Sequence, residues 1–141
     1  MLIPDTMRLG QLFYHINKKM IVTQNNNLSD LGLTLQQALV IAYIYREKNK
    51  KITQRMLEKG LNNTNPTIMN IVKVMMGKNL IYKIQDSLDR RKFYLYLTPI
   101  ALDLAPKCIK RLDETDKDIY KCLTVEEVQT LKKILEKINV K

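Results

Sequence analysis

The chain has 141 residues, of which 45% are apolar and 27% charged, and its net charge is +10 at pH 7. This balance is typical of one globular domain that folds around an apolar core. No apolar run approaches the roughly 20 residues of a membrane-spanning helix, and no signal peptide is evident, so we expect a cytoplasmic protein without a membrane partner. Two cysteines are too few for a disulfide framework.

Most of the positive charge lies in the middle third of the chain. Residues 48–92 contain eleven basic and three acidic side chains, a net charge of +8, whereas the segments before and after them each have a net charge of +1. A basic segment between two nearly neutral flanks is the pattern expected of a protein that contacts a polyanion. The charge therefore favours nucleic acid as the partner.

Apolar residues at helical spacing predict two helices before this basic segment. The first is expected at about 5–22, ending at the asparagine cluster 25–27. The second should begin at Thr34, where Gln37 completes a capping box, and should end at the polar run 47–51. Its buried face is predicted to consist of Leu39, Val40, Tyr43 and Ile44.

Two short helices joined by a tight turn follow. Thr53 can cap the first, which Gly60 should end. In the second, we expect Asn65 at the N-cap and Pro66 at the first helical position, because a residue before proline avoids helical angles. This pair, with one apolar and one polar face on the second helix, predicts a helix-turn-helix motif.

A basic hairpin is predicted directly after this motif. The segments 80–84 and 93–97 are rich in β-branched and aromatic residues and bracket a charged tip, which indicates strand, turn and strand. Alternate side chains of the second strand should pack on the helix-turn-helix, namely Phe93, Leu95 and Leu97, with Tyr94 and Tyr96 on the other face.

Two further helices complete the predicted order. Thr98 and Pro99 should begin the first, and Pro106 should kink it. Thr124 and Glu127 form a capping box at the start of the last helix. The apolar stripe on these two helices is too long for a small domain to cover alone.

From about residue 8 to residue 138 the sequence resembles the MarR family of bacterial winged-helix regulators, the multiple-antibiotic-resistance regulator type. The motifs that carry the resemblance are LTLQQ at 33–37, the spacing from Leu57 through Leu61 to Thr67 and Ile68, NLI at 79–81 and above all DSLDRRKFYLYLT at 86–98. The sequence departs from the family pattern at three positions that are usually glycine or small, which here are Glu58, Asn79 and Ala101.

The resemblance implies a mainly α fold in which a winged helix-turn-helix domain, at about 30–98, is flanked by dimerisation helices at about 5–27 and 99–139. In such a homodimer the second helix of the motif lies in a major groove and the wing along the adjacent minor groove. Three segments would then contact double-stranded DNA. Their residues are Thr53, Gln54 and Arg55; Thr64, Asn65, Pro66, Thr67, Met69, Asn70 and Lys73; and Asp89, Arg90, Arg91 and Lys92.

Individual roles can be assigned within these segments. Asn70 is the residue best suited to read a base, since a side-chain amide can pair with adenine. By resemblance, Arg91 and Arg90 would reach the minor groove, and Asp89 would orient Arg91. The alternative for the polar helix face is a solvated surface, and for the wing tip a charged turn that discourages edge pairing.

Other sites are less clearly marked. By resemblance, a small aromatic effector could bind between the dimer helices and the DNA-binding lobe, lined by Phe13, His15, Tyr43 and Arg46. We predict no metal or other cofactor, because the only histidine and two scattered cysteines supply too few ligands. Cys108 and Cys122 are expected about 21 Å apart on one helix, as buried structural thiols. The alternative is a redox switch through a cysteine pair between subunits.

The sequence thus predicts a sequence-specific DNA-binding transcriptional regulator, a repressor, that acts as a homodimer on a pseudopalindromic operator. An enzyme is not expected, since we find no glycine-rich phosphate loop, nucleophile elbow or catalytic cluster of histidine and carboxylates. The alternative is a winged-helix module that binds RNA or another protein, and a preference for RNA over duplex DNA would distinguish it.

Overall fold

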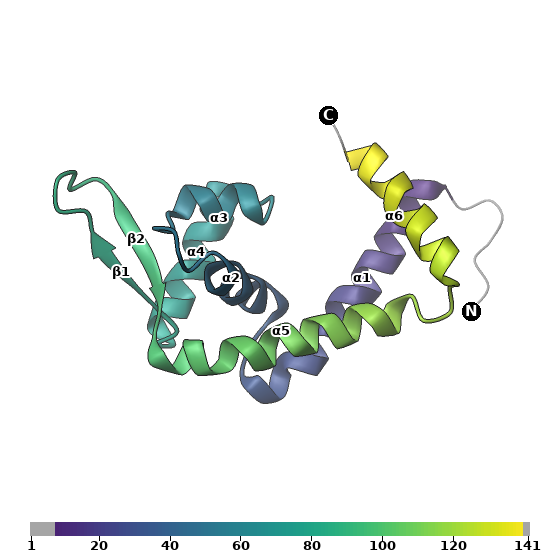
Figure 1. Ribbon diagram of the computed structural model, residues 1–141, viewed down its shortest axis with the longest axis horizontal. Helices are drawn as coiled ribbons and strands as arrows, with labels where there is room; N and C mark the ends of the chain where they lie inside the picture. Colours follow the sequence, from purple (N-terminus) through teal and green to yellow (C-terminus); the bar gives the residue numbers. More distant parts are fainter. Residues whose placement is uncertain (1–7, 140–141) are drawn as a thin grey trace.

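The computed structural model describes residues 8–139, which form seven helical segments and one β-hairpin (Figure 1). The elements are α1 (Leu9–Leu28), the 3-10 helix η1 (Ser29–Leu31), α2 (Leu35–Arg46), α3 (Gln54–Gly60), α4 (Asn65–Gly77), β1 (Ile81–Gln85), β2 (Phe93–Leu97), α5 (Pro99–Ile119) and α6 (Val125–Asn139). This order confirms the predicted mainly α class with a hairpin. Residues 5–7, where we expected the first helix to begin, lie outside the described residues.

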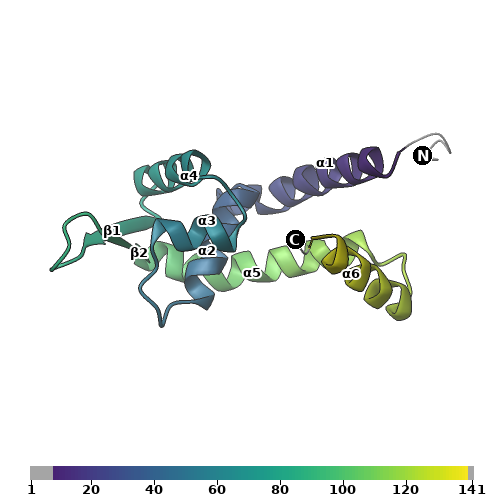
Figure 2. The ribbon, with the colours of Figure 1, turned by 90° about the horizontal axis from the view of Figure 1, so that it is seen from above.

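The elements are arranged as a lobe and an extension. Figure 1 shows α2, α3, α4 and the hairpin gathered in one lobe, with α5 running from the base of the hairpin to α6. Figure 2, turned by 90°, shows α1 leaving the same lobe beside α5. Among residues 8–139, no helix combines the length and the hydrophobicity that a membrane span would need.

The core of the lobe joins all of its elements. Its largest fully buried side chains include Leu28 of α1, Ile41 of α2, Leu57 of α3, Ile68 and Met75 of α4, and Cys108 of α5. Ile52, just before α3, is also buried, and its carbonyl accepts a hydrogen bond of 2.8 Å from the backbone amide of Leu95. The hairpin is therefore fixed to the helix-turn-helix through the backbone.

Helix α1 is longer than predicted, because the asparagine cluster 25–27 lies inside it. The side chain of Asn25 accepts a hydrogen bond of 2.7 Å from the backbone amide of Leu35, and Asn27 Nδ2 donates one of 2.8 Å to Thr115 Oγ1. These side chains bond to other elements and do not form a local turn. The chain turns instead at Gly32, whose φ of 71° is left-handed.

The predicted caps of α2 and α3 are confirmed, but one part of the α2 face was wrong. The Gln37 amide donates to Thr34 Oγ1 at 3.3 Å, and the Met56 amide donates to Thr53 Oγ1 at 3.2 Å. Leu39, expected in the core, is 38% exposed. Helix α2 packs against α5 on one side and against the helix-turn-helix on the other. Its buried apolar side chains are therefore Ala38, Val40, Ile41, Ala42 and Ile44, which do not include Leu39.

Helix α4 begins one residue earlier than predicted. Thr64 is the N-cap, Asn65 is the first helical residue, and the two hydroxyls of Thr64 and Thr67 lie 2.9 Å apart. Asn65 is thus inside the helix and not its cap, and its side chain donates a hydrogen bond to Glu58 of α3. After α4, Asn79 has a φ of 58°, which confirms that asparagine takes the left-handed position where the resembled family has glycine.

Thr98 joins three elements. Its hydroxyl accepts from the Ala101 amide at 3.2 Å, as predicted for the cap of α5, and donates to the Asn79 carbonyl at 2.8 Å, while its amide donates to the Leu80 carbonyl at 3.1 Å. The start of α5 is thereby tied to the end of α4 and to β1. Helix α5 continues through Pro106 to Ile119.

The last helix has a predicted cap and an exposed apolar face. The Thr124 and Glu127 capping box is confirmed, with hydrogen bonds of 2.9 and 3.1 Å. No described residue of α6 is buried. The prediction of two buried thiols on one helix was wrong for Cys122, which is exposed in the turn after α5, whereas Cys108 is buried in the core.

Candidate nucleic-acid interface

Helix α4 has one face in the core and one face in solvent. Ile68, Ile71, Val72 and Met75 are buried at spacings of three and four. The side chains of this helix predicted to contact DNA are exposed on the opposite face, namely Asn65, Pro66, Met69, Asn70 and Lys73, with Thr67 half-buried beside them. The helix therefore presents a short polar surface that a groove could accept.

Glu58 of α3 contacts the first residue of this surface. Asn65 Nδ2 donates a hydrogen bond of 3.0 Å to Glu58 Oε2. A carboxylate only accepts, so this bond fixes which end of the Asn65 amide points at α3 and leaves Oδ1 as the outward acceptor. The glutamate stands where the resembled family has a small residue, and it is accommodated because its carboxylate lies at the surface against α4.

A basic cleft joins the start of α3 to the wing. Its volume is about 440 Å³, and it is lined by Thr53, Gln54, Arg55, Val72, Lys83, Arg91, Lys92, Phe93, Tyr94 and Leu95. Two of the three predicted contact segments thus meet in one concave surface. Guanidinium and ammonium groups around a concave surface are suited to phosphate oxygens.

Lys83 is a member of this cleft that the sequence reasoning did not select. It pairs with Leu95 in the antiparallel register, so its side chain leaves the same face of the hairpin as the buried Leu95. The strand alternation around the predicted core residue Leu95 is the signal that could have identified it. Its ammonium lies 5.1 Å from the centre of the Phe93 ring.

Phe93 was wrongly predicted as a core residue. Leu95 and Leu97 are buried, but Phe93 is 40% exposed. It lies further along the strand toward the tip, where the hairpin extends past α3 and α4 (Figure 1). Tyr94 and Tyr96 were predicted on the other face of the hairpin, and the structure shows in addition that Tyr96 stacks on Tyr82 with ring centres 5.5 Å apart.

The wing tip is organised by Asp86. Its Oδ2 accepts from the backbone amides of Leu88 at 2.9 Å and Asp89 at 2.7 Å, and its Oδ1 accepts from the Tyr94 hydroxyl at 2.9 Å. These bonds lower the pKa of Asp86, with the Asp89 amide contributing most, and the bond to Asp86 raises the pKa of Tyr94. The turn is therefore held by side-chain bonds at neutral pH.

Asp89 and Arg91 form the contact that the resemblance implied. Arg91 Nε lies 3.1 Å and its terminal nitrogen 3.3 Å from the two carboxylate oxygens, while the Arg91 amide donates to Oδ1 at 3.0 Å. The hydrogen bond from the Arg91 side chain is the main cause of the lowered pKa of Asp89. The arginine side chain is still 90% exposed, and Arg90 and Lys92 beside it are exposed as well.

Few carboxylates neutralise the bases of this lobe. Among residues 8–139, only two of the six ion pairs lie between α2 and the end of β2, Lys50 with Glu47 and Arg91 with Asp89. The others lie on or beside α5. The net charge of residues 48–92 is thus largely uncompensated at the surface.

The four residues proposed for an effector are divided between two parts of the chain. Phe13 lines a shallow hollow with Leu135 and Ile138 of α6. His15 is exposed on α1, and Arg46 is exposed at the end of α2. The ring of Tyr43 packs against Gly60, the last residue of α3.

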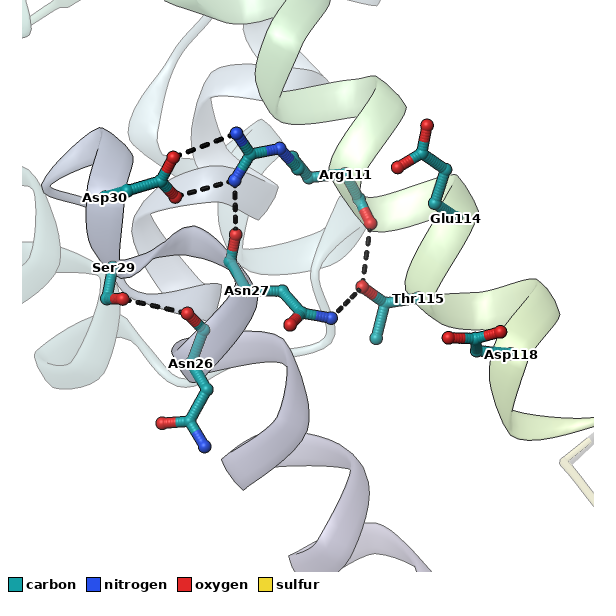
Figure 3. Close-up of a pocket in the computed structure, with 8 residues that line it drawn as sticks. All are labelled: Asn26, Asn27, Ser29, Asp30, Arg111, Glu114, Thr115 and Asp118. Atoms are coloured by element: carbon teal, nitrogen blue, oxygen red, sulfur yellow. Dashed lines mark hydrogen bonds and ion pairs between the residues drawn. The ribbon is translucent and has the colours of Figure 1, made fainter.

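A polar hollow of about 490 Å³ lies where the end of α1 meets α5 (Figure 3). Arg111 donates to both oxygens of Asp30, at 2.6 and 2.9 Å, and to the Asn27 carbonyl at 2.7 Å. The hydrogen bond from Arg111 lowers the pKa of Asp30. Within the described part of the chain, no group of three or more His, Cys, Asp or Glu residues is arranged to hold a metal ion.

Comparisons with known proteins agree with this geometry. The family model described as MarR family matches residues 31–92, which span α2 to the wing tip. The multiple antibiotic resistance protein MarR of Salmonella typhimurium is 29% identical over 135 residues, which cover 95% of this chain and 92% of the relative.

Two solved structures with DNA are also similar. The S. aureus MepR–DNA complex matches with a TM-score of 0.89 and 26% identity, over 94% of this chain and 96% of MepR. A mutant MarR from E. coli complexed with operator DNA matches with a TM-score of 0.84 and 25% identity, over 94% of each chain. The relative and the two solved structures each cover nearly the whole chain, and the family model covers residues 31–92, so the chain is similar to transcriptional regulators of the MarR family and shares their winged helix-turn-helix fold.

Proposed function

We propose that this protein is a cytoplasmic, homodimeric repressor of transcription that binds a pseudopalindromic DNA operator. The observation that carries the proposal is the exposed polar face of α4 beside the basic cleft between α3 and the wing. Side chains for base edges and side chains for phosphates are thereby presented together. The likeness to MepR and MarR structures that contain DNA supports the same partner.

The division into two functional regions is part of the proposal. The segment at about 30–98 would bind DNA, and the helices at about 5–27 and 99–139 would form the dimer. The support is the row of large apolar side chains exposed in a single chain, on α1 (Leu9, Phe13 and Ile16) and on α6 (Leu131, Ile134, Leu135 and Ile138). A contiguous apolar surface of this kind is typical of an interface.

Each DNA-binding segment would have its own task. Asn65, Thr67, Met69, Asn70 and Lys73 would face the major groove, with Thr64 and Pro66 at the start of the same helix, and Asn70 would be the main base reader. Thr53, Gln54 and Arg55 would contact phosphates, and Arg90, Arg91 and Lys92 would follow the minor groove with Asp89 orienting Arg91. In a two-fold dimer the half-sites would lie about one helical turn, roughly 34 Å, apart.

Titration of the purified protein against the duplex upstream of its own gene, with a scrambled duplex of equal length, tests the proposal. We expect a clear preference for the native sequence and an affinity that falls steeply with salt, because each neutralised phosphate releases counterions. Equal affinity for both duplexes, or a preference for structured RNA in competition, would contradict it.

Arg91→Ala and Lys107→Ala form a matched pair within this experiment. Arg91 lies in the wing, whereas Lys107 is an exposed base on α5. We expect the wing substitution to weaken operator binding by at least about 1 kcal/mol and the α5 substitution to have a smaller effect. Equal losses would show that only total charge matters.

Release by a small aromatic effector would complete the function. Its support is limited to the aromatic and basic side chains Phe13, His15, Tyr43 and Arg46 on α1 and α2, which would have to be brought together in the dimer. Calorimetry with a series of phenolic acids, followed by operator titration with each, tests this. Absence of both heat and any change in DNA affinity would contradict it.

A further inference from the structure

Leu88 lies at the tip of the wing with its side chain almost entirely in water. It is 96% exposed, more than any other large apolar side chain among residues 8–139. Isolated apolar residues on a surface are common and need no special explanation. The position of Leu88 in the turn is what makes it informative.

The turn around Leu88 is rigid on both sides. The Leu88 amide donates to Asp86 Oδ2 at 2.9 Å, and the next amide, of Asp89, donates to the same oxygen at 2.7 Å. Further along, the Lys92 amide donates to the Asp89 carbonyl at 3.0 Å, and Gln85 Nε2 donates to the Arg90 carbonyl at 2.8 Å. The backbone of the tip is thus fixed, and the Leu88 side chain is presented outward from it.

The turn also fixes Leu88 relative to the arginine proposed for the minor groove. Asp89, the residue after Leu88, holds the Arg91 side chain through two oxygens. An arginine that enters a minor groove from this tip therefore brings Leu88 to the same groove. Proteins that bind the minor groove frequently combine cationic side chains with apolar contacts there.

We infer that Leu88 is a DNA-contacting residue whose side chain packs against the deoxyribose walls of the minor groove beside Arg91. The inference rests on the proposed function. It assigns to the wing an apolar contribution to affinity, in addition to the charges of Arg90, Arg91 and Lys92. An apolar contact releases no counterion, so its contribution does not depend on salt.

The test is operator affinity measured over a series of salt concentrations for four variants. Leu88→Ala should raise Kd about fivefold at every salt concentration, the effect of losing part of one buried leucine. Leu88→Asn, similar in size but polar, should raise Kd by the same factor, and the Kd of Leu88→Met should stay within about twofold of that of the native protein. Arg91→Ala should lower the slope of log Kd against log salt by about 1, whereas the slope of the leucine variants should be unchanged.

The controls distinguish loss of a DNA contact at Leu88 from loss of protein stability, and failure of this inference from failure of the proposed function. Thermal melting should be unaffected by the Leu88 substitutions, because the side chain is exposed, and Ile100→Ala, a 54% exposed apolar residue on α5, should not change Kd. If Leu88→Ala and Leu88→Asn bind as the native protein does while Arg91→Ala is weakened, the inference is wrong and the proposed function stands. If the native protein has no preference for its operator, the proposed function itself fails.

Discussion

The ring of Tyr43 packs directly on Gly60, so that a Cβ at Gly60 would lie 2.9 Å from Cζ and 3.0 Å from Cδ2 of the ring. Real Cβ atoms do not approach other heavy atoms this closely, so α2 and α3 can meet here only because residue 60 is glycine. Gly60 therefore sets how closely the first helix of the motif is seated, and it also ends that helix.

Gly60→Ala should lower the free energy of unfolding by about 1–3 kcal/mol, because the added methyl group overpacks this contact. Gly77→Ala is the matched control, since a Cβ at the last residue of α4 would meet nothing within 4 Å. That variant should be unchanged or more stable by up to about 1 kcal/mol. Urea unfolding measures both, and equal values for the two variants would contradict the packing argument.

Glu58→Ala should relax the base preference of the protein. The hydrogen bond from Asn65 to Glu58 holds the amide in one orientation, and without it either end of the amide can face the DNA. Loss of a carboxylate near DNA raises affinity for every duplex, so the informative quantity is the ratio of operator to scrambled Kd. Among DNA sites that the variant selects from a random pool, the base preference should weaken at one position in each half-site. An unchanged base preference at every position would contradict this role.

Asp86→Asn should weaken the wing in a pH-dependent manner. The pKa of Asp86 is lowered in the folded protein relative to about 3.9 in the unfolded chain, so its contribution is present above that value and is lost as the pH falls below it. The difference in melting temperature between native protein and variant should be constant from about pH 7 to 5 and should shrink below about 4.

Tyr94→Phe provides the check on this assignment. It removes the hydroxyl that donates to Asp86, so its effect should not add to that of Asp86→Asn. The coupling between the two substitutions should also disappear at low pH. Additive effects at pH 7 would show that the two groups act independently.

Ile134→Glu should produce monomers if the apolar face of α6 forms the dimer interface. Ile134 is 49% exposed in a single chain, and a charge buried there without a partner would oppose association. Lys133→Glu, one residue earlier, is the control on the same helix. Sedimentation should detect loss of the dimer only for the first variant, with helical content retained in both because no described residue of α6 is buried within the chain.

The two cysteines should react differently with a thiol reagent. Burial raises the pKa of Cys108 to about 11, so at pH 8 its reactive thiolate is scarce as well as inaccessible, whereas Cys122 is exposed. Ellman's reagent should modify one thiol per native chain and two in urea, and the fast thiol should be absent from Cys122→Ser. Rapid modification of that variant under native conditions would contradict the burial of Cys108.

Features set by neighbouring residues could be predicted from the sequence. The capping boxes at Thr34 and Thr124, the cap at Thr98 and the left-handed Asn79 depend on contacts within a few residues or on backbone angles of one residue. The element order and the basic middle segment likewise required only periodicity and charge. The family pattern then supplied the relation between these elements.

Features set by distant residues could not be predicted in this way. The asparagine cluster of α1 is typical of a turn, but in the structure Asn25 accepts a hydrogen bond from Leu35 and Asn27 donates one to Thr115. Asn65 has the sequence context of an N-cap, but its side-chain amide donates to Glu58, seven residues earlier. Phe93 alternates with core residues, but alternation does not show at which residue a hairpin extends beyond the domain. Lys83 was overlooked because only the strand register places it in the cleft.

The scarcity of carboxylates in the lobe that holds the cleft also bears on how the protein behaves without DNA. The uncompensated bases of residues 48–92 repel one another in the free state, so the surface that attracts DNA lowers the stability of the fold that presents it. Any polyanion that binds only the folded form relieves this repulsion and raises the melting temperature. The choice of buffer anion is therefore part of any stability measurement on this protein, and chloride and sulfate should give different melting temperatures at equal ionic strength.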